Sequence, residues 1–103
     1  MTAPPEREWS ESREYQAATR DETVWARVAG RGETLGVQIE PAAMSRDGRQ
    51  LAEQIQACVD AAFLESQLDQ RRTMQRHGVA SEHYEWMASP EELQAARERL
   101  GRL

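Results

Sequence analysis

The 103-residue chain has no lysine, one cysteine and one phenylalanine. A single cysteine cannot form a disulfide within the chain, which favours a reducing compartment. No apolar run approaches the length of a membrane span, and the first residues show neither the basic nor the apolar region of a secretory signal. Together these absences predict a cytoplasmic protein.

The chain also has few groups that could perform chemistry. Cys58 and His77 are separated by nineteen positions on one predicted helix, so they would lie about 28 Å apart at about 1.5 Å per residue and cannot form a catalytic dyad. Cys58 falls in an apolar stripe, which is typical of a buried, inert thiol. Neither His77 nor His83 has neighbours at metal-site spacings. The sequence therefore predicts no enzyme, metal or cofactor.

Charge sets a condition on nucleic-acid binding. The formal net charge is −5, and every lysine or arginine position, 13 in all, is arginine. A general nucleic-acid binder is usually basic. Any such role here would need a local basic patch.

Two alternating segments and a glycine-rich turn predict a β-hairpin. Residues 23–29 place Val24, Ala26 and Val28 on one face, and residues 34–40 alternate in the same way after Gly30–Glu33. A weaker alternation over 13–20 predicts a third strand, giving a three-stranded antiparallel meander over residues 13–40. Trp25 would lie on the opposite face, where packing against a second covered face is favoured over an exposed, ligand-stacking role.

A long helix is predicted from Asp47 to Gly78, with Asp47 and Gln50 at its start and glycine as the C′ residue. One apolar stripe should cover the sheet, and a second should meet another helix, most economically its copy in a second chain. The fold class is therefore α+β. The first stripe comprises Leu51, Ala52, Ile55, Cys58, Val59 and Ala62, and the second Ala57, Ala61, Leu64 and Leu68. The residues predicted to be largely buried are Val28, Val37, Ile39, Leu51, Ile55 and Val59.

The two ends flank this core of residues 13–78. Residues 1–12 are polar and predict a disordered tail in which Trp9 is solvated. Residues 79–103 predict an aromatic linker followed by a short helix that begins at Ser89-Pro90 and ends at Gly101. That helix is too short to be stable alone, so it must dock. Its expected anchor is Tyr84, Trp86 and Met87.

The stretch from Val28 to Pro41, VAGRGETLGVQIEP, resembles the YbaB/EbfC family of small bacterial nucleoid-associated proteins. It is similar to that family's strand, G-x-G-type turn, second strand and I-[DE]-P ending. The helix continues the resemblance with Leu51…Ile55 and Ala61-Ala62-Phe63. The resemblance covers residues 14–70 and implies an intertwined homodimer that binds DNA without strong sequence preference.

The ends depart from that family pattern. Its members usually begin with a long helix rich in Met, Gln and Lys, whereas residues 1–12 here are short and acidic. The stretch from Ser89 to Leu93 resembles actinobacterial relatives linked to type VII secretion. That second resemblance implies a cytoplasmic protein-binding adaptor as the alternative function.

Each hypothesis has its own residues. The DNA hypothesis uses a cluster at the end of the long helix, Arg71, Arg72 and Arg76, although helix-end cations on a solvated face are the simpler explanation. The homodimer would pack through Ala61, Leu64 and Leu68. The adaptor hypothesis uses Tyr84, Trp86 and Met87 as the protein-partner surface. The preferred hypothesis is a non-enzymatic, dimeric, YbaB-type binding protein.

Overall fold

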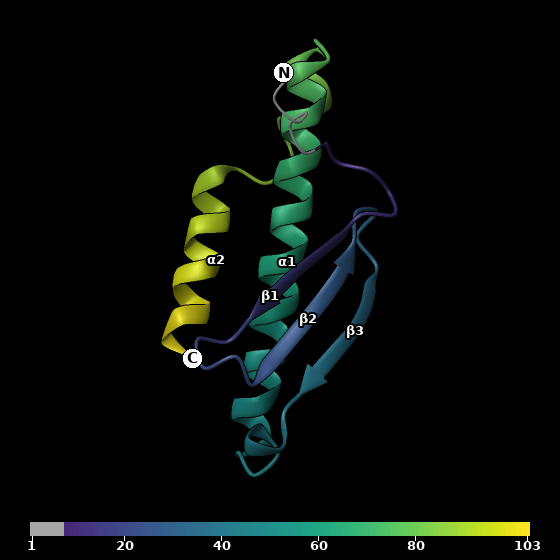
Figure 1. The fold of residues 1–103 in the computed structure, drawn as a ribbon. Coiled ribbons are helices and arrows are strands. Elements are labelled where there is room, and N and C mark those ends of the chain that lie inside the picture. Colours follow the sequence, from purple (N-terminus) through teal and green to yellow (C-terminus); the bar gives the residue numbers. More distant parts are fainter. Residues whose placement is uncertain (1–7) are drawn as a thin grey trace, which may run out of the picture.

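The computed structural model describes residues 8–103. Three strands come first, followed by the long helix α1 and the shorter helix α2 (Figure 1). The strands β1 (Glu14–Ala18), β2 (Val24–Ala29) and β3 (Thr34–Ile39) form one antiparallel sheet in the order β1-β2-β3. The predicted α+β class, meander and helix order are confirmed.

The turn between β1 and β2 is built around one carboxylate. Asp21 Oδ1 accepts hydrogen bonds from the hydroxyls of Thr23 at 2.7 Å and Thr19 at 2.8 Å, and Arg46 Nη2 lies 2.5 Å from Asp21 Oδ2. These hydrogen bonds, the one from the Thr23 hydroxyl foremost, hold the pKa of Asp21 well below its ordinary value. The clamped turn places Glu22 at φ 60°, a conformation that non-glycine residues seldom adopt.

Replacing Asp21 by Asn should make the protein less stable in a pH-dependent way. Because the folded-state pKa is depressed, the carboxylate stabilises the fold above its unfolded pKa of about 3.9, and this contribution is lost as pH falls toward the folded pKa. The difference in melting temperature between native protein and variant should have its maximum value at neutral pH. It should shrink below about pH 4. If the difference in melting temperature did not depend on pH, the ionised Asp21 carboxylate would not be what stabilises the turn.

The helix α1 (Gly48–Arg76) ends with the predicted glycine. Gly78 has φ 74°, its N–H donates to Gln75 O at 3.1 Å, and Val79 N–H donates to Met74 O at 3.0 Å. This pair of bonds is a Schellman motif, which satisfies carbonyls at the helix end. At the other end Asp47 is the N-cap residue, but its side chain makes no capping hydrogen bond.

The core lies between the sheet and α1. Val24, Ala26 and Val28 of β2 are fully buried, and α1 contacts both β1 and β2. Val37 was expected to be buried but is 42% exposed, and Ile39 is only half-buried. A helix about 10 Å wide can cover two strands spaced about 4.8 Å apart. The third strand, β3, therefore extends beyond the cover of α1.

The rotational phase of α1 also differs from expectation. Gln54 and Cys58 are buried at the centre of the helix face, whereas Ala52 is exposed. The predicted core residues Leu51, Ile55 and Val59 are half-buried at its margin. Gln54 tolerates burial because its amide has two partners: Arg46 Nη1 donates to Gln54 Oε1, and Gln54 Nε2 donates to Leu103 O, each at 2.9 Å.

The helix α2 (Pro90–Arg102) packs beside α1 in the same chain (Figure 1). Ser89 caps it by accepting from Glu92 N–H at 3.2 Å, as the sequence predicts. Leu93 and Leu100 are its buried side chains. Gly101 lies inside the helix rather than ending it, because the chain continues helically to Arg102. Within the chain, α2 therefore packs against the second apolar stripe of α1. The predicted contact of this stripe with the helix of a copy stays a prediction.

The start of the described chain is attached to the sheet. Trp9 Nε1 donates to Gly30 O at 2.9 Å, and Trp9 N–H donates to Thr73 Oγ1 at 3.1 Å. The Ser10 carbonyl oxygen lies where a side chain at residue 30 would point, so glycine is needed there. Trp9 is half-buried, and its predicted solvated position is wrong. Residues 1–7 of the predicted tail lie outside the described residues.

Candidate nucleic-acid interface

The three arginines predicted to contact DNA lie in the last two turns of α1. They do not face one way. Arg71 is half-buried: its Nη1 donates to Met87 O at 3.3 Å and Ala88 O at 3.4 Å, and its guanidinium lies 5.7 Å from the centre of the Tyr84 ring. Arg71 therefore fastens the linker to α1, which leaves less of its charge for an external phosphate.

Arg72 and Arg76 lie about 40° apart around the helix axis, given about 100° per residue. Both are exposed. Arg76 Nη2 donates to Thr73 Oγ1 at 3.1 Å. Arg72 lines a groove between β1 and α2 that also contains Arg97. We call Arg72 and Arg76 the α1 cationic pair.

The arginines of α2 are partly offset by carboxylates. Arg97 Nη2 lies 3.7 Å from Glu65 Oε2, and Arg99 Nη1 lies 3.8 Å from Asp60 Oδ2. Such exposed pairs contribute only about 0–1 kcal/mol, but they reduce the local positive potential. These pairs make Arg97 and Arg99 poor candidates for phosphate contacts.

The residues predicted at the dimer interface occupy the side of α1 that faces α2. Ala61 and Leu68 are buried within the chain, and Leu64 is half-buried. Leu68 shares the β1–α2 groove with Tyr15 and Leu93. Within one chain these side chains pack helix against helix. Their role between copies stays a prediction.

The predicted protein-partner residues separate into three environments. Met87 is buried, Tyr84 is half-buried beneath Arg71, and Trp86 is 71% exposed. The Trp86 indole Nε1 donates to His83 O at 3.1 Å, which fixes the ring on the surface. Met87 and Tyr84 therefore anchor the linker, as expected, and Trp86 alone presents a large apolar group to solvent.

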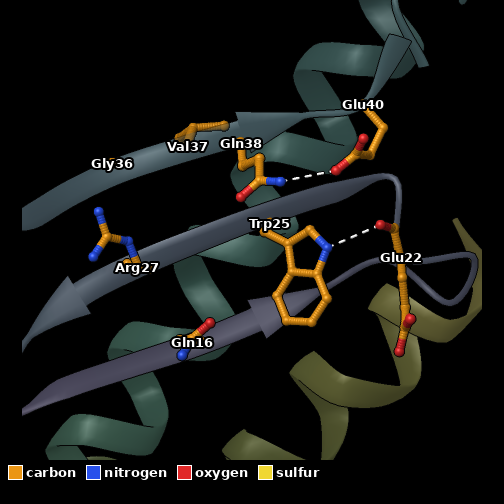
Figure 2. Close-up of a pocket in the computed structure, with 8 residues that line it drawn as sticks. All are labelled: Gln16, Glu22, Trp25, Arg27, Gly36, Val37, Gln38 and Glu40. Carbon is orange, nitrogen blue, oxygen red and sulfur yellow. Dashed lines mark hydrogen bonds between the residues drawn. The ribbon is translucent and has the colours of Figure 1, made fainter. Parts of the chain in front are cut away.

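Sequence reasoning missed a hollow on the face of the sheet opposite α1. Figure 2 shows Trp25 at its centre with Gln16 and Gln38 on the neighbouring strands. No element among residues 8–103 covers this face, so the second layer expected over Trp25 is not formed by the described part of the chain. The alternation that placed Trp25 opposite Val24 was the available signal. We call this region the outer hollow.

Candidate chemistry is limited in the described part of the chain. Burial raises the pKa of the Cys58 thiol to about 11, and its sulfur donates to Val24 O at 3.6 Å. It is therefore protonated and shielded at neutral pH. Residues 8–103 contain no group of three or more His, Cys, Asp or Glu side chains placed to hold a metal ion. None of the helices formed by those residues has the length and apolarity needed to cross a bilayer.

One comparison with known proteins gives a match. The family model described as the YbaB/EbfC DNA-binding family matches residues 7–78. This range includes all three strands and the whole of α1, and it ends before the linker and α2. No curated protein and no solved structure matches the chain. The comparisons thus add no support for the secretion-linked alternative.

Proposed function

The chain belongs to the YbaB/EbfC DNA-binding family, and on that premise we propose that it is a non-enzymatic, nucleoid-associated homodimer that binds DNA through phosphates. The observation that carries this proposal is the family match over residues 7–78. The proposed localisation of the protein is the cytoplasm, at the nucleoid. Arginine–phosphate contacts without base readout would give binding that is insensitive to sequence.

The C-terminal end of α1 suits this role because two exposed arginines lie there one helical turn apart. Both side chains of the α1 cationic pair are exposed. Two copies would present two such pairs, which doubles the number of phosphates contacted. Each phosphate contact releases condensed counterions, so binding should weaken steeply with salt.

The open edge of β3 supports self-association. Glu40 N–H donates to Thr23 O at 2.8 Å, and the register then alternates, so Val37 and Ile39 turn their backbone N–H and C=O groups away from β2. Leu35 and Val37 are 40% and 42% exposed on this strand, and Phe63 of α1 is 37% exposed. An exposed apolar edge without lysine or proline invites pairing with another strand.

We propose that this edge pairs with the same edge of a second copy across a two-fold axis. Antiparallel pairing of a strand with itself is self-complementary, as an isologous interface requires. It would join the two sheets and cover Leu35 and Val37. We define the β3 edge surface as Leu35, Val37, Ile39 and Phe63. The alternative interface through Ala61, Leu64 and Leu68 would require α2 to leave its own α1, since α2 covers two of those side chains.

Removing the α1 cationic pair tests DNA binding. The double variant Arg72→Ala, Arg76→Ala should weaken binding of a mixed-sequence duplex at least about tenfold at ~50 mM salt. The slope of log affinity against log salt should fall by up to about 0.9 for each phosphate contact removed. Binding can be measured by mobility shift and by fluorescence anisotropy of a labelled duplex.

The matched control is Arg20→Ala with Arg49→Ala, which removes the same charge. Both arginines are exposed. Arg20 lies on the β1–β2 turn, and Arg49 lies at the start of α1, the end opposite to the cationic pair. Arg71 is kept in both variants because its loss would loosen the linker. Equal weakening by the control pair would show a diffuse charge effect. Absence of any duplex shift by the native protein at ~50 mM salt would overturn the proposed function.

A further inference from the structure

The outer hollow has a volume of about 630 Å³ and draws side chains from all three strands. Gln16 of β1, Trp25 and Arg27 of β2, and Gln38 of β3 lie on this face (Figure 2). Gly36 of β3 pairs with Arg27 of β2 in the sheet. Because Gly36 has no side chain, it leaves the hollow open at this position. The hollow is thus an uncovered sheet face with one aromatic ring at its centre.

The Trp25 ring is held in place before any ligand arrives. Its indole Nε1 donates to Glu22 O at 2.9 Å, a bond drawn in Figure 2. The ring is half-buried and lines the hollow. Indole is the aromatic group that attracts cations most strongly, by about 0.5–1 kcal/mol at exposed sites and about 2 kcal/mol where water is excluded. A fixed indole loses little conformational entropy on binding.

The charges around Trp25 favour a cation over an anion. Glu22 and Glu40 line the hollow, and Glu40 Oε1 accepts from Gln38 Nε2 at 2.8 Å. Among residues 8–103, Arg27 is the one cation that lines the hollow, and Glu14 Oε2 lies 3.3 Å from its Nη1. The hollow and its margin thus hold three carboxylates and one guanidinium, and Glu14 pairs with that guanidinium. A phosphate would be repelled here, so this face is a poor surface for nucleic acid.

From this geometry we propose that the outer hollow docks a basic segment of another protein. An arginine or lysine side chain of that segment stacks on Trp25 and is attracted by the carboxylates of Glu22 and Glu40, which line the same hollow. The amides of Gln16 and Gln38 are placed to hydrogen-bond the polar groups of an extended chain. This surface is separate from the α1 cationic pair, so the inference goes beyond the proposed DNA binding and does not depend on it.

The probe is a fluorescein-labelled, N-acetylated peptide of four Gly-Arg repeats, titrated with native protein in the absence of DNA. We expect saturable anisotropy that weakens as salt rises, because the pairs are exposed to solvent. Trp25→Ala should weaken binding about tenfold, which corresponds to the upper part of the cation–π range. Glu22→Gln with Glu40→Gln should weaken it similarly.

The matched control is Glu82→Gln with Glu85→Gln, which removes the same charge near the linker. Both residues are exposed and lie outside the hollow. This control should leave the peptide affinity within about twofold, since long-range attraction is screened beyond roughly 10 Å at 0.1 M salt. If the control weakens binding as much as the hollow variants do, general acidity attracts the peptide and the proposal fails.

A second variant separates binding from folding. Glu22→Gly removes the carboxylate at a position whose φ of 60° suits glycine, so its melting temperature should equal or exceed that of native protein. Its peptide affinity should nevertheless fall. The last arm titrates labelled oligo-dT. If Trp25→Ala weakens oligo-dT binding and leaves peptide binding unchanged, the hollow stacks bases and the proposal is overturned. Duplex binding by the α1 cationic pair is read separately and is unaffected by either result.

Discussion

Replacing Leu35 and Val37 together by Glu is expected to convert the proposed homodimer into a folded monomer. Each side chain is about two-fifths exposed in the single chain. Covering the exposed part should contribute roughly 1 kcal/mol per side chain, so four such side chains in a dimer contribute roughly 4 kcal/mol. Their loss weakens association about a thousandfold, before the repulsion between the new carboxylates is counted.

Light scattering or sedimentation at micromolar concentration measures this directly. Native protein should have the mass of two chains, and the double variant the mass of one. Circular dichroism should remain close to native, because neither side chain belongs to the fully buried core. A native mass of one chain would remove the basis for a dimer.

The matched comparison is Leu64→Glu, which puts the same charge on the other candidate interface. Leu64 is half-buried on the side of α1 next to α2. If the dimer forms through the β3 edge surface, Leu64→Glu should leave the mass at two chains. The reverse pattern, with Leu64→Glu monomeric and the β3 variant dimeric, would place the interface on the α1 side predicted from sequence.

The sequence predicted the sheet well because β2 is covered on one face only. Val24, Ala26 and Val28 alternate with Trp25 and Arg27, and that period shows directly which side faces the core. The end of α1 and the start of α2 were equally readable, since Gly78 and Ser89 perform local tasks that depend on their immediate neighbours. Such local signals do not need the rest of the fold.

The misassigned core residues depend on distances that the sequence does not contain. Val37 alternates as regularly as Val28, but β3 lies beyond the width of α1. Gln54 reads as polar and exposed, and only the fold brings Arg46 and the carbonyl of Leu103 to its amide. Those two partners permit its burial and so set the phase of the helix.

The candidate site was only half readable for a similar reason. Arg71 and Arg72 are adjacent in sequence but project about 100° apart. The linker meets Arg71, whereas Arg72 faces the β1–α2 groove. Helical periodicity gives the angle between two side chains, but it does not show which of them another segment will cover. The same gap explains why the outer hollow was missed: only the structure shows that no helix or strand of residues 8–103 covers the face of the sheet that carries Trp25.

The second large effect is expected from Leu68→Ala. Leu68 is 3% exposed and lies between β1 and α2, beside Tyr15 and Leu93. Truncating a buried leucine costs about 2–5 kcal/mol, through lost apolar burial and the cavity left behind. The total free energy of unfolding of a domain of this size is roughly 5–15 kcal/mol. At about 4–8 °C for each kcal/mol, the melting temperature should fall by at least about 10 °C.

The variant is best measured in the Leu35→Glu, Val37→Glu background, where dimer dissociation no longer contributes to the melting temperature. Leu64→Ala is the matched control, and since that side chain is half-buried its cost should be about half as large. If α2 of the same chain covers Leu68, the full loss appears in the monomer and is independent of protein concentration. If a copy covered it instead, dissociation would already expose Leu68, and truncation would then cost less than about 1 kcal/mol.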